Sequence, residues 1–275
     1  MCIALELNRE LSPKRLAVWL RSILSYLSES RPLLIQRFVG KNRCLKNLES
    51  SYTVVNPYVV PFVAYLVGAS VVGSLPLEYY AVAYSLMVVG VGIATWCLVR
   101  GKNIVIPHWR IGEAIVVGLV GIAIWIVLSE LQLETLVTKH LPGWLRPAAR
   151  VSFNPFEKLS ANWEIYTFIV FRLIGLSLLV PVVEEVFWRG FLSRWLIADN
   201  WDEIAVGTFT WGAFWGVVGL FTLAHPEWLA AATYCALMSG LFYWKKDIWS
   251  CIVAHGVSNF AMGVYVLTTG TWSLW

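Results

Sequence analysis

Charged residues are scarce in this chain: Asp, Glu, Lys and Arg together make up 14% of it, whereas 58% of the residues are hydrophobic. Soluble globular domains carry about 25% charged residues, so this shortage excludes an ordinary soluble domain. The mean hydropathy is correspondingly high, at +0.66. Long apolar runs and sixteen tryptophans, a residue enriched where helix ends meet lipid headgroups, indicate instead an all-α, polytopic membrane helix bundle.

Cysteine and histidine are also few, and their spacing excludes several kinds of site. The chain lacks the C-x-x-C pairs of structural zinc sites and the H-E-x-x-H motif of zinc proteases. It also lacks the G-x-S-x-G motif of serine hydrolases and a Gly-rich phosphate-binding loop. Two histidines and a carboxylate can still hold a catalytic zinc ion, so that alternative stays open at this point. The scattered cysteines, which indicate neither a disulfide framework nor a zinc site, are Cys2, Cys44, Cys97, Cys235 and Cys251.

The first 53 residues are basic and contain no segment that could cross a membrane. They carry nine Lys or Arg against four Glu, and their apolar run Leu16–Leu27 is short and interrupted by Arg21. Basic amphipathic helices lie on anionic membrane surfaces, and basic segments stay in the cytoplasm. We therefore expect residues 1–53 to form a cytoplasmic amphipathic segment. Nucleic-acid binding, the other interpretation of a basic run, is not expected because membrane spans follow directly.

A transmembrane domain is predicted over residues 54–275, with about seven spans (six to eight). Each apolar segment is close to the roughly 20 residues that a bilayer requires. Basic residues place the loops 100–110 and 245–247 on the side of the N-terminus, whereas the mixed stretch 132–163 is expected to connect two spans on the opposite side. The predicted spans are Val54–Leu75, Leu77–Val99, Ile111–Leu131, one from about Glu164 into the stretch Leu179–Arg194, and then Ile204–Ala224, Trp228–Trp244 and Ile248–Thr268.

The stretch Leu179–Arg194 places two adjacent glutamates and an arginine in an otherwise apolar run. Ionisable residues at such depth are costly and usually mark a functional path. On a helix, Glu185 and Arg189 share a face, whereas Glu184 points about 100° away. This spacing predicts that Arg189 neutralises Glu185 and leaves Glu184 for chemistry. The alternative is a purely structural ion pair with a spare carboxylate.

Two histidines and an asparagine occur in the apolar segments that follow. His225 ends the run FTLAH, and His255 lies in the last span with Asn259 one turn later on the same face. A carboxylate beside a histidine can take a proton from water. A second histidine and an asparagine amide can donate hydrogen bonds to the oxyanion that forms when water attacks a carbonyl. The set therefore predicts hydrolysis by an activated water.

In these three motifs the chain resembles the CPBP family of intramembrane proteases, which includes the type II CAAX prenyl endopeptidases and the bacterial Abi proteins. The motifs E-E-x-x-x-R, F-x-x-x-H and H-x-x-x-N occur in the family's order between about residues 164 and 269, the expected protease core. The resemblance implies that Glu184 and His225 activate the attacking water, and that His255 and Asn259 stabilise the oxyanion.

The same resemblance implies that Glu185 is held by Arg189, in agreement with their spacing. Trp188 and Phe221 are expected to line the substrate pocket. Because the family is treated as glutamate-type, we expect no metal and no other cofactor.

A further likeness extends back to Asn56. The segment NPYVVPFVAYLV, the region of Trp163 and the closing TGTW are similar to the CAAX protease-related subfamily of bacteria with exosortase-type protein sorting. The resemblance implies an intramembrane endopeptidase of a bacterial inner membrane with a cytoplasmic N-terminus. Its partners would be membrane lipid, a membrane-anchored protein or peptide substrate, and sorting or secretion proteins. The alternative is a non-hydrolytic scaffold or transporter component of such a system, although the inverted repeats typical of transporters are not found.

Overall fold

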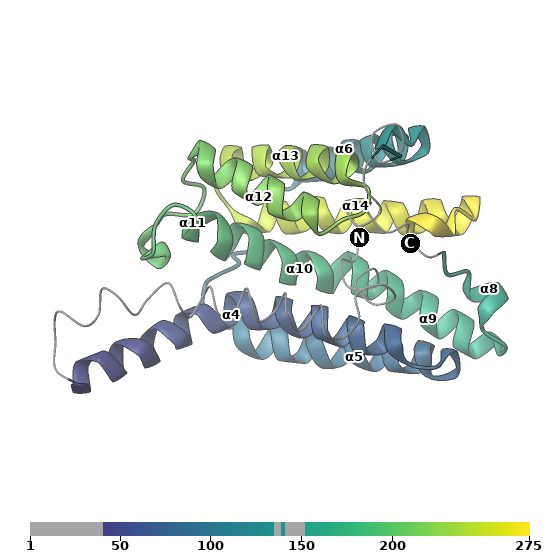
Figure 1. Ribbon diagram of the computed structural model, residues 1–275, viewed down its shortest axis with the longest axis horizontal. Coiled ribbons are helices and arrows are strands. Elements are labelled where there is room, and N and C mark those ends of the chain that lie inside the picture. Colours follow the sequence, from purple (N-terminus) through teal and green to yellow (C-terminus); the bar gives the residue numbers. More distant parts are fainter. Residues whose placement is uncertain (1–40, 135–138, 141–151) are drawn as a thin grey trace.

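The computed structural model describes residues 41–134, 139–140 and 152–275, and side chains from residue 55 onward within these ranges. The described residues are helical apart from turns and loops (Figure 1). Of the amphipathic segment predicted over residues 1–53, residues 1–40 lie outside the described part. Residues 41–53 form the first turns of a helix that continues into the first span.

Ten α-helices and two π-helical segments make up most of the described chain. Helix α9, the π-helix η2, helix α10, the π-helix η3 and helix α11 follow one another without a break as a rod of 34 residues, Asn162–Trp195. The elements are α4 (Lys41–Ser74), α5 (Leu77–Val99), α6 (Gly112–Leu131), α8 (Pro155–Lys158), α9 (Asn162–Ile174), η2 (Gly175–Leu179), α10 (Val180–Glu185), η3 (Val186–Leu192), α11 (Ser193–Trp195), η4 (Trp201–Glu203), α12 (Trp211–Leu223), α13 (Trp228–Lys245), α14 (Ile248–Thr269) and η5 (Trp272–Leu274).

Five helices of the described chain are long and apolar enough to cross a membrane, which confirms a polytopic helical membrane protein. They coincide with five of the seven predicted segments, and the other two predicted segments form α12 and α13. The first helix begins well before its predicted span, at Lys41, but its apolar part matches the prediction. The five candidate spans are Val55–Ser74, Leu77–Val99, Gly112–Leu131, Asn162–Trp195 and Ile248–Thr269.

Helix α12 is shorter than the sequence predicts, because it begins at Trp211 rather than at Ile204. Gly207 has a φ of +80°, in the left-handed region that favours glycine, and turns the chain there. Thr210 then caps the helix by accepting a hydrogen bond from the backbone N–H of Ala213 at 3.1 Å. Thirteen residues span only about 20 Å, less than the ~30 Å hydrocarbon core.

The length of α12 decides how deep His225 lies in the bundle. A full crossing by residues 204–224 would carry His225 to the face opposite Glu184. In the structure, His225 lies 14 residues after the start of α12, and Glu184 lies 11 residues before the end of the rod at Trp195. The start of α12 and the end of the rod lie at the same end of the bundle (Figure 1). At ~1.5 Å per residue the two side chains therefore lie at similar depths, about 21 and 16 Å from that end.

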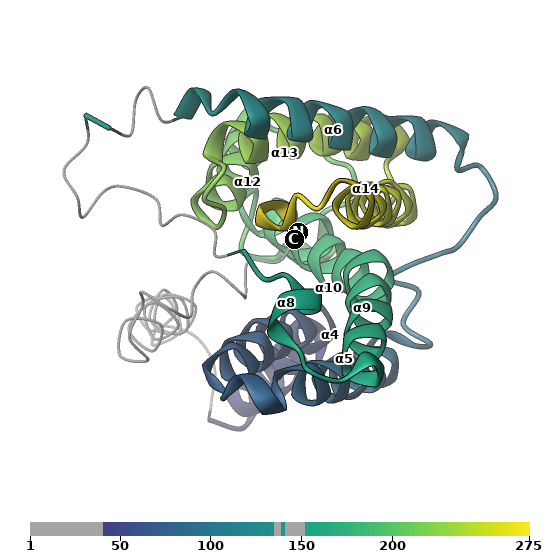
Figure 2. The same cartoon turned by 90° about the vertical axis from the view of Figure 1, so that its right-hand side faces the viewer.

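The rod divides the bundle into two groups of helices. Figure 2 shows α4 and α5 on one side of the rod and α6, α12, α13 and α14 on the other. Arg172, in the first half of the rod, is buried among aromatic rings. Its guanidinium carbon lies 5.4 Å from the ring centre of Tyr84 and 5.7 Å from that of Trp275. Arg172 is therefore held inside the bundle and does not point outward to the surface.

Helix α14 packs closely on both of its neighbours because small residues line the contacts. A Cβ atom on Gly256 would lie 2.7 Å from the carbonyl oxygen of Ser177 in η2. On the opposite side, a Cβ on Gly118 of α6 would collide with the backbone of Ala254. The hydroxyl of Ser258 donates a hydrogen bond to the carbonyl oxygen of Gly118 at 2.8 Å. These contacts hold α14, which carries His255 and Asn259, between α6 and the rod.

We expect Gly256→Ala to destabilise the protein and to lower its activity. The new methyl group meets a backbone oxygen that cannot rotate away, so α14 has to move off η2, at a cost of about 1–3 kcal/mol. The measurement is the unfolding temperature in detergent. Gly240→Ala in α13 is the matched control, since nothing lies within 4 Å of its added Cβ. Equal unfolding temperatures for the two variants would contradict the prediction.

One end of the bundle collects the loops that the sequence places on the side of the N-terminus. The loop 100–111 and the turn between α13 and α14 lie together there (Figure 1). The ammonium group of Lys245 lies 3.4 Å from Oε1 of Glu113. The indole N–H of Trp249 donates to the carbonyl oxygen of His108 at 2.9 Å. The arrangement therefore puts both basic loops on one side of the membrane.

We predict that this side is the cytoplasm, because basic loops are retained there. Reporter fusions at positions 50, 104 and 246 should all give a cytoplasmic signal. A fusion at position 160, in the loop before α9, is the control and should report the opposite side. An external signal at position 104 alone would show that the span order is wrong.

Candidate active site

A proline interrupts the backbone hydrogen bonding of the rod next to the glutamate pair. The N–H of Val180 bonds to the carbonyl oxygen of Gly175, five residues back, as in a π-helix. Pro181 has no N–H with which to continue this pattern, so the carbonyl of Leu176 is left for another donor. The side-chain amide of Asn259 supplies it, with 2.7 Å between Nδ2 and the oxygen. A helical irregularity, typical of functional sites, thus joins α14 to the rod.

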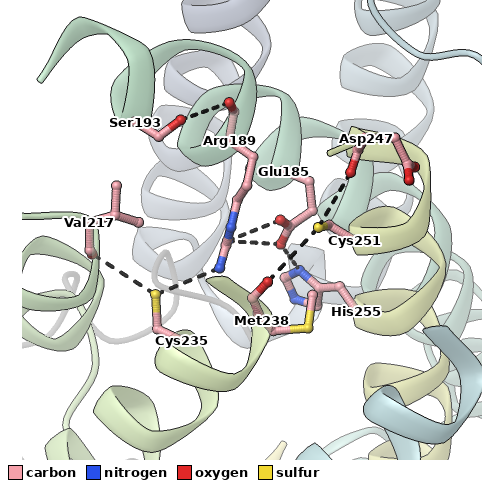
Figure 3. A network of polar contacts seen from close by, with 9 residues as sticks. All are labelled: Glu185, Arg189, Ser193, Val217, Cys235, Met238, Asp247, Cys251 and His255. Carbon is pink, nitrogen blue, oxygen red and sulfur yellow. Dashed lines mark hydrogen bonds and ion pairs between the residues drawn. The ribbon is translucent and has the colours of Figure 1, made fainter. Parts of the chain in front are cut away.

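Glu185 is the centre of a buried ion-pair network (Figure 3). Nη1 of Arg189 lies 3.0 Å from its Oε2 and 3.2 Å from its Oε1, as the four-residue spacing predicts. Nδ1 of His255 lies 2.8 Å from Oε1. Because a carboxylate only accepts, Nδ1 carries the hydrogen, and Nε2 is the basic nitrogen of the neutral ring. Glu185 therefore binds Arg189 and orients His255.

Glu184, the adjacent residue, is bound quite differently. Its side chain is as deeply buried as that of Glu185. Neither of its carboxyl oxygens is in full hydrogen-bond geometry with a described residue. The indole N–H of Trp188, one turn later, interacts with the carboxyl group only weakly. A buried polar group without a partner costs free energy, and such groups mark sites that bind another molecule or do chemistry. The rod therefore carries one glutamate, Glu185, that is held by an ion pair and hydrogen bonds, and one, Glu184, that is not.

His225 is held at the end of α12 by its own helix and by aromatic rings. Its Nδ1 donates to the carbonyl oxygen of Phe221 at 2.8 Å, so Nε2 is the basic nitrogen of the neutral ring. The ring of Phe221 stacks on the imidazole with 4.3 Å between ring centres. Trp188 lies edge-on to Phe221 at 5.6 Å, and Trp125 lies edge-on to His225 at 5.8 Å. Phe221 and Trp188 thus connect His225 to the turn of Glu184.

The polar side chains of the site are enclosed by the bundle. Each is at most 5% exposed, although the surroundings are apolar helices. Enclosure strengthens every electrostatic interaction inside the site, because water does not screen it. The enclosed side chains are Glu184, Glu185, Arg189, His225, His255 and Asn259.

The donor set does not match a metal centre. Among the described residues, no group of three or more His, Cys, Asp or Glu could hold a metal ion. Nδ1 of His255 is engaged by Glu185 and Nδ1 of His225 by a backbone carbonyl. The geometry thus gives the zinc alternative no set of three ligands among these residues.

Three residues outside the motifs also contact the site, namely Cys235, Tyr234 and Trp125. Cys235 of α13 contacts Arg189, with 3.7 Å between Sγ and Nη2. Tyr234 lies edge-on to His255 at 6.0 Å and to Trp125 at 5.8 Å. These residues come from α6 and α13. Nothing in their sequence spacing marks them, because each reaches the site only through contacts between helices.

The fold and this site define a multi-pass helical membrane protein with a buried cluster of ionisable side chains. Residues 166–261 match the family model "Type II CAAX prenyl endopeptidase Rce1-like", so this part of the chain is an Rce1-like domain. The match includes all three motifs, and the family is one of proteases, which makes the chain a membrane enzyme of the protease class. No curated protein and no solved structure matches the chain.

Proposed function

We propose that the protein is an intramembrane endopeptidase that hydrolyses a peptide bond near the membrane in a membrane-anchored protein or peptide. The observation that carries the proposal is the division between the two glutamates. Glu185 is bound by Arg189 and His255, whereas the buried Glu184 has only a weak interaction with the indole N–H of Trp188. A carboxylate in such a position is suited to take a proton from water.

The proposed reaction uses the two sides of the site separately. Glu184, with His225, takes a proton from water as its oxygen attacks the carbonyl carbon of the substrate. The carbonyl becomes an oxyanion. Asn259 donates to it through the Nδ2 hydrogen that does not bind Leu176, and His255 donates through Nε2 once that nitrogen has taken up a proton. When the C–N bond breaks, the captured proton passes to the leaving nitrogen, and the products are a carboxylic acid and an amine. Phe221 and Trp188 form the wall of the pocket beside Glu184.

The direct test is cleavage by the purified protein in detergent or vesicles. The probes are a reporter peptide that ends in a farnesylated CAAX sequence and the same peptide without the prenyl group. Cleavage of either supports the proposal, and the comparison shows whether the prenyl group is recognised. If neither probe nor a membrane-anchored protein reporter is cleaved, the alternative of a non-hydrolytic scaffold or transporter component is favoured.

We also propose a narrower assignment, to the CAAX protease-related subfamily of bacteria with exosortase-type sorting. It rests on the segment from Asn56, the Trp163 region and the closing TGTW. It would place the enzyme in a bacterial inner membrane, with sorting or secretion proteins as partners. Residues 1–53 would then be a cytoplasmic surface segment and residues 54–275 the membrane domain. Sorting genes beside this one would support the assignment, and their absence from related genomes would contradict it.

Activity is expected to survive removal of metal ions. The reacting groups proposed above need no metal to polarise the carbonyl or to activate the water. Prolonged chelation of the purified protein should therefore leave the cleavage rate of the reporter peptide unchanged. Loss of activity on chelation and its return with zinc, in a protein that binds one zinc ion through His225 and His255, would overturn the expectation.

A further inference from the structure

The thiol of Cys235 lies between the two helical segments that carry the proposed catalytic groups. Its side chain is fully buried in α13. Sγ lies 3.7 Å from Nη2 of Arg189 in the rod and 4.0 Å from the carbonyl oxygen of Val217 in α12. Figure 3 shows these contacts as a line from Val217 through Cys235 to Arg189.

The two contacts are chemically compatible with one thiol. A thiol has a single hydrogen and a sulfur that accepts weakly. Because Arg189 only donates, the sulfur accepts a hydrogen of its guanidinium, which leaves the S–H to donate to the carbonyl of Val217. The side chain of Ser239, one turn later in α13, also interacts with the thiol. Cys235 therefore connects the rod to α12 without a covalent bond.

Arg189 depends on this contact because its other partners are few. Nη1 binds Glu185, and Nε has no partner among the described residues. Cys235 is the only side chain of the described part to which Nη2 donates. A guanidinium buried in an apolar bundle keeps its orientation only through such contacts. Arg189 in turn orients Glu185, and Glu185 orients His255.

On the other side, Val217 lies eight residues before His225, about two turns along α12. A contact at Val217 therefore helps to fix the position of α12 along α13 and the rod. That position decides where His225 stands relative to Glu184.

We infer that Cys235 is a positioning residue of the active site, which aligns Arg189 with Glu185 and the His225-bearing helix with the rod. The inference rests on the proposed hydrolytic function. A purely structural explanation is that Cys235 fills space in the core, as buried cysteines commonly do.

Alanine and serine at position 235 separate these explanations, because they are similar in size but only serine keeps an acceptor and a donor. We expect Cys235→Ala to lower kcat for the reporter peptide by about tenfold to a hundredfold, since small misplacements of reacting groups have effects of this size. KM should change by less than about twofold, and Cys235→Ser should retain kcat within about threefold. A space-filling role would make the two variants alike.

Cys251→Ala is the matched control for the loss of a buried thiol. Cys251 is equally buried, but within the described part of the chain its Sγ donates only to backbone oxygens, those of Asp247 at 3.7 Å and Met238 at 4.0 Å. It should retain kcat. The inference is wrong if Cys235→Ala keeps wild-type kcat, if Cys235→Ser is as slow as Cys235→Ala, or if Cys251→Ala is as slow as either.

A second measurement does not depend on activity and separates failure of this inference from failure of the proposed function. Cys235→Ala should lower the unfolding temperature by about 3 °C in the wild-type background and by clearly less in an Arg189→Met background. Equal losses in the two backgrounds would show that Cys235 and Arg189 are not coupled. If the coupling is present but no reporter is cleaved by the wild-type protein, the proposed function fails and the contact stands.

Discussion

Glu184→Gln is expected to abolish cleavage of the reporter peptide while leaving the protein folded. The amide has nearly the same size as the carboxyl group but cannot take a proton from water. General-base groups contribute about a hundredfold to ten-thousandfold to the rate, so the loss should be at least of this order. The substitution breaks no strong contact of the described residues, because the carboxyl group of Glu184 interacts only weakly with the indole N–H of Trp188, and the amide oxygen can keep that interaction.

The measurement combines the cleavage rate with the unfolding temperature in the same detergent. Glu130→Gln, at an exposed position near the end of α6, is the control for removing a carboxylate and should change neither quantity. Near-normal cleavage by Glu184→Gln would refute the assignment of the base. A large drop in its unfolding temperature would instead show that Glu184 has a structural role.

Glu185→Gln is expected to destabilise the protein as well as inactivate it. The glutamine keeps an oxygen that can accept from Nδ1 of His255, but it removes the only carboxylate bonded to Arg189 among the described residues. An uncompensated buried charge costs on the order of 3–5 kcal/mol. For a chain of this size that corresponds to a fall in unfolding temperature of roughly 10 °C. Arg189→Met should be similarly harmful, because it leaves the carboxylate of Glu185 without its cation.

The double variant Glu185→Gln, Arg189→Met distinguishes a true pair from two independent losses. Neither charge is then stranded, so part of the lost stability should return, although cleavage should not. Thermal unfolding of the two single variants, the double variant and the wild type gives the coupling directly. A double variant no more stable than the less stable single variant would show that the two residues do not act as a pair.

Much of the site is predictable because helix geometry is local. Residues four apart share a face, and this places Arg189 beside Glu185 and turns Glu184 away from it. The same rule puts His255 and Asn259 on one face of α14. In the structure both side chains face the rod, one bonding Glu185 and the other bonding Leu176.

Prediction failed where a glycine inside an apolar run shortened a helix. The run from Ile204 to Ala224 is apolar enough to suggest a span, but Gly207 turns the chain and Thr210 begins the helix later. Hydropathy averages over such a stretch and does not register its backbone conformation. The shorter helix matters, because it is what brings His225 to the depth of Glu184.

The sequence by itself determined the membrane class, the position of most spans and the pairing of neighbours on one helix. These follow from scarce charge, from segment length and from the 3.6-residue turn, all of which are local properties. Only the tertiary structure decided which distant groups meet. The carbonyl of Leu176, released by Pro181, finds its donor 83 residues later in Asn259, and Arg189 meets Cys235 46 residues later. Such partners are chosen by how the helices pack against the rod, and no spacing along the chain encodes that choice.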